Sequence, residues 1–100
     1  MTTETLGVTG ATMTPIGDLV WRSDARIHGK VSSMRVQPWA DVASLECVVV
    51  DPTGGVLLVF LGRRRVPGIE LGRALEAHGM VGESRGYMAI LNPEIELLGS

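Results

Sequence analysis

Cysteine and aromatic residues are scarce in this sequence, which has one cysteine and four aromatic side chains among 100 residues. A single cysteine forms no intramolecular disulfide, and Cys47 lies in an apolar stretch, which predicts a small buried core residue rather than a reactive thiol. No apolar run approaches the ~20 residues that a helix needs to span a bilayer, and the N-terminus lacks the charged-then-apolar layout of a signal peptide. These absences predict a cytoplasmic protein with no membrane partner.

Motifs of catalysis and of metal binding are also missing. The sequence has no nucleophile next to a base, no phosphate-binding loop and no convincing pair of carboxylates. His28 and His78 could lie on neighbouring strands, but two histidines without a cysteine or a clear carboxylate as third ligand make a poor metal site. We therefore expect a protein that is not an enzyme and that holds no metal and no cofactor.

Glycine and proline, by contrast, are plentiful. Thirteen glycines and five prolines imply many turns, and a hydrophobic content of 45% suits one compact domain with a modest core. Residues 1–14 are rich in threonine and glycine without periodicity, which predicts a disordered tail. Thr14 and Pro15 resemble the cap and the first position of a helix that Gly17 limits to one turn.

The most informative stretch is a pair of apolar runs, 45–50 and 56–61, separated by the turn formers 51–55. The runs are rich in β-branched residues and predict a β-hairpin. In its turn, Pro52 suits the first central position and Gly54 suits a left-handed one.

The rest of the chain reads as further strands. In chain order we expect a strand over 25–36, a loop over 37–44, a strand over 74–81, a tight turn over 82–86, a strand over 87–91 and a possible edge strand over 95–98. Five strands with a break between the third and the fourth favour a small all-β barrel, because closure removes exposed sheet edges.

Several segments in this order resemble the OB-fold nucleic-acid-binding domains that are grouped with transfer-RNA anticodon-binding and helicase-wedge domains, in particular short actinobacterial proteins. The segments that carry the resemblance are 26–31, 50–55, 60–64, 66–69, 72, 75–79 and 91–97. The resemblance implies a five-stranded Greek-key barrel over 15–98 with little or no helix. It also implies a ligand groove across strands two and three, bordered by the loops after strands one and four. Family members often carry a helix between strands three and four, but 66–71 leaves room only for a loop or a single turn.

Charge is the main sequence evidence for a function. The net charge of −2 argues against a strong general nucleic-acid binder, yet cations are concentrated within 25–36 and at 63–65. Guanidinium groups suit phosphate, and aromatic faces stack on bases, so with the resemblance we expect binding of single-stranded DNA or RNA with low sequence specificity. Trp39 and Tyr87 are the expected stacking residues. The full candidate set is Arg26, Lys30, Arg35, Trp39, Arg63, Arg64, Arg65, Arg85 and Tyr87.

Two alternatives stay open. The arginines could form a solvated turn while Trp39 caps the barrel. The central hairpin is apolar on both faces, and only one face of a barrel strand points inward. The outer set includes Val48 and Val50 with either Val56, Leu58 and Phe60 or Leu57, Val59 and Leu61. This set could be covered by residues 19–21 or by a protein partner, which would make the chain an interaction or homo-oligomerisation module. The candidate interface is Val48, Val50, Leu57, Val59 and Leu61.

Overall fold

The computed structural model describes residues 13–99, most of which lie in β-strands. The elements are the 3-10 helix η1 (Ile16–Asp18) and the strands β2 (Asp24–Trp39), β3 (Val42–Asp51), β4 (Gly54–Leu61), β5 (Ala74–Ser84), β6 (Tyr87–Leu91) and β7 (Glu94–Leu97). The tail predicted over 1–14 falls mostly on residues 1–12, outside the described residues. Within 13–99, no helix is long and apolar enough to cross a membrane.

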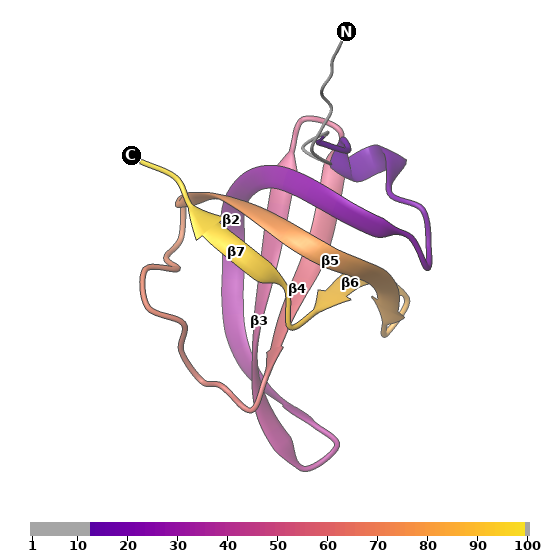
Figure 1. Ribbon diagram of the computed structural model, residues 1–100. Helices are drawn as coiled ribbons and strands as arrows, with labels where there is room; N and C mark the ends of the chain where they lie inside the picture. Colours follow the sequence, from indigo (N-terminus) through magenta and orange to yellow (C-terminus); the bar gives the residue numbers. More distant parts are fainter. Residues whose placement is uncertain (1–12, 100) are drawn as a thin grey trace, which may run out of the picture.

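Five of the strands close into a ring. β2 pairs antiparallel with β3 and with β5, β3 pairs with β4, β5 pairs with β6, and a parallel pairing of β4 with β6 closes the barrel. β7 adds to β5 as a short outer strand. Figure 1 shows β2 curving around the barrel, which lets one strand pair with two neighbours. This arrangement is a five-stranded OB-type β-barrel, and the predicted all-β fold is confirmed.

Alternating side chains fill the barrel interior. The inward positions of β2 and β5 follow a period of two, because every second residue of a strand faces the same side. Burying an aliphatic side chain contributes about 1.5–3 kcal/mol, so this cluster is the main source of stability. Its buried strand residues are Ala25, Ile27, Val31, Leu45, Cys47, Val49, Val56, Leu58, Phe60, Leu75, Ala77, Val81 and Ile90. Burial raises the pKa of the Cys47 thiol to about 11, which keeps it protonated and unreactive.

The first hairpin differs from the prediction. β2 continues to Trp39 and β3 begins at Val42, so the loop expected over 37–44 is wrong. The connection is a two-residue turn in which Ala40 and Asp41 have φ of 46° and 70°, and the twist of such a turn suits paired strands. Pro38 pairs with Ala43 where β2 has no partner on its other side, and an edge position of this kind tolerates the missing N–H of proline.

The central hairpin forms as predicted, but its turn is closed by a side chain. Leu61 pairs with Ser44 and Gly54 pairs with Asp51 at the two ends of β3 and β4. The left-handed conformation expected of Gly54 is wrong, because its φ is not positive. The Asp51 carboxylate instead accepts the N–H groups of Thr53 at 2.7 Å and of Gly54 at 3.0 Å, which stabilises the turn.

The same carboxylate anchors the N-terminal segment. Asp51 accepts the Ile16 N–H at 2.9 Å, and Thr53 Oγ1 accepts the Gly17 N–H at 2.8 Å. The bond from the Ile16 N–H, followed by those from the Thr53 hydroxyl and from the Thr53 and Gly54 N–H groups, lowers the pKa of Asp51 to about 2. The sequence had indicated Thr14 as the cap of η1, and this is wrong. Pro15 holds the cap position, without a side-chain bond. The single turn itself agrees with the prediction.

The turn between β5 and β6 is shorter than expected. β5 runs to Ser84, so the predicted turn over 82–86 contracts to Arg85 and Gly86, with φ of 52° and 85°. The chain between β4 and β5, 62–73, contains no helix, in agreement with the short stretch at 66–71. The edge strand expected over 95–98 is β7, and it pairs with β5 rather than continuing β6.

The outer face of β4 carries Leu57, Val59 and Leu61, which decides between the two alternative sets. Leu57 and Val59 form a second buried cluster with Ala89 of β6, and Val48 and Leu61 pack against it. Cover by residues 19–21, one of the alternatives left open, does not occur: Leu19 packs in the interior cluster, while the side chains of Val20 and Trp21 are exposed. The neighbouring strand β6 covers this part of the face instead.

Candidate functional site

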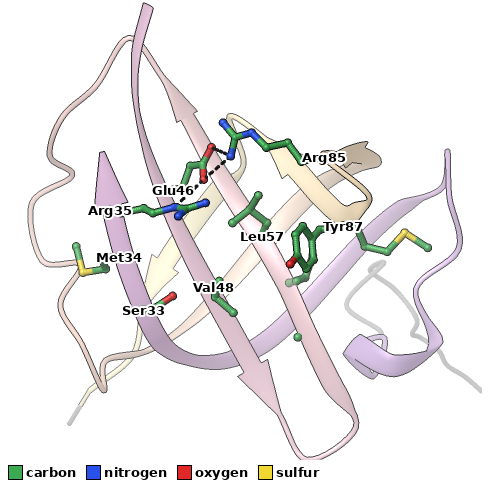
Figure 2. A pocket seen from close by; sticks show the side chains of 11 residues that line it. Ser33, Met34, Arg35, Glu46, Val48, Leu57, Arg85 and Tyr87 are labelled. Atoms are coloured by element: carbon green, nitrogen blue, oxygen red, sulfur yellow. Dashed lines mark hydrogen bonds and ion pairs between the residues drawn. The ribbon is translucent and has the colours of Figure 1, made fainter. Parts of the chain in front are cut away.

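A groove of about 610 Å³ lies on the outer face of the barrel, where β2, β3 and β4 meet the β5–β6 turn. Figure 2 shows its side chains converging from these elements. Its lining comprises Ser33, Met34, Arg35, Glu46, Val48, Gly55, Val56, Leu57, Arg85, Tyr87 and Met88. The groove crosses the second and third strands of the barrel, as expected for a ligand site in an OB-type fold.

The floor of the groove is apolar, and one end of it carries no side chain. Val48 and Leu57 face each other in the register of β3 and β4. Gly55 lies two residues before Leu57, and it carries no side chain that would raise the floor at this end. An apolar floor of this kind suits the face of a planar ring, because stacking and dispersion need close contact over an area.

One end of the groove is an ion-pair cluster that consists of Glu46, Arg35 and Arg85. Arg35 Nε lies 3.5 Å from Glu46 Oε1, and Arg85 Nη1 lies 3.0 Å from Glu46 Oε2. Arg85 Nη1 also donates a hydrogen bond to Oε1 at 3.2 Å. Glu46 is 2% exposed, whereas both arginine side chains reach solvent. One carboxylate and two guanidinium groups leave this end with a formal charge of +1.

Tyr87 forms a wall of the groove and is 68% exposed, so its ring is accessible to a ligand. It lies two residues after Arg85, across the turn, and pairs with Ser84 of β5. In Figure 2 the Tyr87 ring and the Arg85 side chain lie on the same side of the groove, with Leu57 between them. An exposed aromatic ring beside a guanidinium provides a stacking surface next to a positive charge.

Strand register and chain order relate other predicted cations to the two ends of the groove, although these cations do not line it. Lys30 is exposed and pairs with Val50 of β3, and Val50 pairs with Gly55 of β4. Lys30 therefore lies level with Gly55 across the three strands, at that end of the groove. At the opposite end the chain leaves β4 after Leu61. The exposed arginines 63–65 follow directly, beyond the ion-pair cluster, and none of them makes an ion pair within residues 13–99.

Of the nine predicted residues, Arg35, Arg85 and Tyr87 line the groove, and Lys30 and the arginines 63–65 do not. Arg26 and the backbone of Trp39 lie on parts of β2 away from it. Arg26 lies on the part of β2 that pairs with β5, and its guanidinium lies 3.6 Å from the Glu76 carboxylate. Trp39 ends β2 opposite Val42, at the tip of the first hairpin, and the description of this residue covers its backbone only. The stacking role predicted for Trp39 therefore stays a prediction.

The predicted protein interface overlaps the groove floor. Val48 and Leu57 line the groove, but Leu57 is only 8% exposed and Val59 is fully buried. Val50 and Leu61 are partly exposed. Most of the apolar area of this set is thus already covered within the barrel, which leaves little for a partner to bury.

Sequence reasoning missed Glu46, the residue that holds the two groove arginines. One signal was present: Glu46 is the only charged residue in the apolar run 45–50. The period of two places it on the outer face with Val48 and Val50. Its partners could not be read from the sequence, because they lie 11 and 39 residues away.

A second cluster of titratable groups lies outside the groove. His78 of β5 contacts Asp24 Oδ2 through Nε2 at 2.8 Å and Glu94 Oε1 through Nδ1 at 3.4 Å. These carboxylates, with that of Asp24 first, raise the pKa of His78 above 6.5. The cluster ties the starts of β2 and β7 to β5, and within the described residues no group of side chains fits a metal ion.

Comparison with known proteins identifies the fold and no closer relationship. No protein-family model and no curated protein sequence matches the chain. Among solved structures, the chain is similar to the solution NMR structure of a replication factor A related protein from Methanobacterium thermoautotrophicum. The two are 17% identical with a TM-score of 0.62, over 91% of this chain and 94% of the other. At this identity the similarity establishes the OB-type fold alone.

Proposed function

We propose that the chain is a cytoplasmic, non-enzymatic module that binds single-stranded DNA or RNA in the outer groove with low sequence specificity. The observation that carries the proposal is the exposed Tyr87 ring above an apolar floor, with Arg35 and Arg85 at one end of the same groove. The resemblance of the sequence to anticodon-binding and helicase-wedge domains supports it. So does the similar barrel of a protein related to a replication factor.

The bound strand follows β4. A base stacks on Tyr87 over Val48 and Leu57, and the backbone continues past the ion-pair cluster toward the arginines 63–65. In the other direction it passes Lys30. This path brings exposed cations to both ends of an apolar floor, which is the combination that binds single strands without reading their sequence.

The expected affinity is modest. One stacked base contributes about 1–3 kcal/mol, and Tyr87 is the only aromatic side chain that lines the groove within the described residues. The positive end of the groove carries one net charge because Glu46 neutralises one of its two arginines. The exposed arginines 63–65 therefore provide most of the electrostatic attraction.

The test is a titration of a fluorescent single-stranded oligonucleotide, DNA and RNA separately, followed by anisotropy in low salt. Tyr87→Ala should weaken binding roughly 5- to 150-fold, the equivalent of about 1–3 kcal/mol. Trp21→Ala is the matched control, because Trp21 is an exposed aromatic residue that does not line the groove. Equal affinity of wild type and Tyr87→Ala, or no binding by the wild type, would overturn the proposal.

Protein association is the competing function, since it would use the same face. It predicts a mass in light scattering that rises with concentration and falls on Val48→Lys, together with oligonucleotide binding that Tyr87→Ala leaves unchanged. A monomer at all concentrations whose binding depends on Tyr87 excludes it.

A further inference from the structure

Glu46 stands where an anionic ligand of the groove would stand. Its carboxylate lies between two guanidinium groups that come from different elements, β2 and the β5–β6 turn, and both are within 3.5 Å. Figure 2 shows Arg35 and Arg85 reaching toward it from opposite sides. A phosphate bound by two arginines is held in the same way, by forked donors that converge on its oxygens.

Glu46 does not engage all the hydrogen-bond donors of either arginine. Arg85 contacts it through Nη1 alone, and within residues 13–99 its Nε and Nη2 make no hydrogen bond. Glu46 Oε2 is buried and accepts no hydrogen bond, although Arg85 Nη1 is 3.0 Å away. Charge therefore holds Oε2 to Arg85 without an aligned hydrogen bond.

The burial of Glu46 also limits what the arginines can do. If both guanidinium groups turned to a ligand, a carboxylate that is 2% exposed would lose its compensating charge, and an uncompensated buried charge is strongly unfavourable. Arg35 is held a second time by Gln37, whose amide oxygen, once turned toward it, accepts from Nη2 at 2.9 Å. A ligand phosphate therefore competes with an anion that is already in place.

We propose that Glu46 is a specificity-determining residue: it occupies the phosphate position between Arg35 and Arg85 and excludes oxyanions from this end of the groove. A bound strand must then be held by base contacts at Tyr87 and by the cations outside the cluster. The identity of the ligand rests on the proposed function, whereas the competition between Glu46 and an oxyanion does not.

The test compares wild type with Glu46→Gln, which keeps the shape of the side chain and removes its charge. The first probe is pyrophosphate, followed by NMR through the Nε–Hε signals of Arg35 and Arg85. Glu46→Gln should bind it on the order of tenfold more tightly than wild type. The second probe is the fluorescent oligonucleotide, which should bind more tightly by a similar factor. Its plot of log affinity against log salt should be steeper by about 0.7, for one more phosphate neutralised.

A double variant separates the effect of releasing Arg85 from the effect of a changed net charge. Arg35→Gln with Glu46→Gln leaves Arg85 alone, so this end of the groove keeps the formal charge of +1 that it has in wild type. Thermal melts show which variants are folded at the assay temperature. The double variant should also bind pyrophosphate more tightly than wild type, because Arg85 no longer faces an internal carboxylate.

The two probes distinguish the two proposals. Tighter pyrophosphate binding by the variants without any oligonucleotide binding would overturn the proposed function and support the role of Glu46. Oligonucleotide binding by wild type that Glu46→Gln leaves unchanged in strength and salt slope, with no gain for pyrophosphate, would overturn the role of Glu46 alone. Weaker binding of both probes by a folded Glu46→Gln would show that Glu46 only positions the arginines, and would also overturn it.

Discussion

At the scale of single residues, the environment of His78 makes the stability of the barrel depend on pH near neutrality. Its two ring nitrogens face the carboxylates of Asp24 and Glu94, and Arg26 is a weaker opposing charge on the same strand as Asp24. The imidazolium form can donate to both carboxylates, while the neutral ring can donate to only one. The protonated form is therefore favoured in the folded state.

The sign of the effect follows from the raised pKa of His78. A group whose pKa is higher in the folded than in the unfolded state stabilises the fold fully below its unfolded pKa, near 6.5. The stabilisation disappears as the pH rises through the folded pKa. The melting temperature of wild type should thus be higher at pH 5.5 than at pH 8, and His78→Gln should remove this part of the difference.

His28→Gln is the control for this measurement. His28 is exposed on β2, and within the described residues its ring forms no ion pair or hydrogen bond. It should retain the pH dependence of wild type. A His78→Gln protein whose melting temperature changes between pH 5.5 and 8 as much as that of wild type would contradict the role assigned to the two carboxylates.

At the scale of elements, the bend of β2 depends on Gly29. This strand pairs with β5 up to Lys30 and with β3 from Lys30 onward, so it turns from one neighbour to the other at this point. A Cβ atom at Gly29 would lie 2.6 Å from the Val50 carbonyl oxygen and 2.7 Å from Val49 Cγ1. Backbone at this distance cannot move aside without opening the pairing of β2 with β3.

Gly29→Ala should therefore lower the free energy of unfolding by about 1–3 kcal/mol. In a domain of this size that corresponds to a fall in melting temperature of roughly 4–8 °C per kcal/mol. Gly82→Ala is the matched control, since Gly82 is also a strand glycine but its added Cβ would find its nearest neighbour, the Ala89 carbonyl oxygen, at 4.0 Å. Equal melting temperatures for the two variants would refute the argument from close approach.

The strands show where sequence patterns suffice and where they do not. The period of two located the strands because alternation records burial, as at Leu75, Ala77 and Val81. The ends of strands depend on turn geometry, which residue preferences describe less well. In the first hairpin, Ala40 and Asp41 adopt left-handed conformations between the paired strands. In the central hairpin, the Asp51 carboxylate stabilises the turn, for which a left-handed Gly54 had been expected. The first missed turn depends on the twist of the paired strands, whereas the second is held by local bonds from the Asp51 side chain, which residue preferences for φ do not describe.

The candidate site was predicted in part for the same reason. Arg35, Arg85 and Tyr87 meet in one groove, as expected from the resemblance to OB-fold domains. The sequence did not indicate that Glu46 holds both arginines, because this depends on barrel closure bringing the β5–β6 turn over β3. Local patterns identify residues of the right chemistry, whereas the balance of charge among them is a property of the closed barrel.

At the scale of the whole molecule, the net charge of −2 opposes nucleic-acid binding, so attraction must come from where the cations lie. Arg63, Arg64 and Arg65 are exposed beyond the ion-pair end of the groove. If the bound strand reaches them, replacing all three with alanine removes about three phosphate contacts. The slope of log affinity against log salt should then become shallower by about 2, at about 0.7 per phosphate of a single strand.

The triple alanine variant also takes the net charge from −2 to −5, and this change alone weakens the attraction for any polyanion. A control of equal net charge separates the two effects: Val20→Glu, Leu71→Glu and Met80→Glu add three acids at exposed positions that do not line the groove. A general field effect predicts the same loss of affinity and the same slope in both variants. If the bound strand contacts the arginines, only the alanine variant should have a slope of log affinity against log salt that is shallower by about 2. The acidic variant should keep the slope of wild type and bind somewhat more weakly at low salt. Equal slopes in the two variants would show that the bound strand ends before residue 63, and would confine the interface to the groove between Lys30 and Arg85.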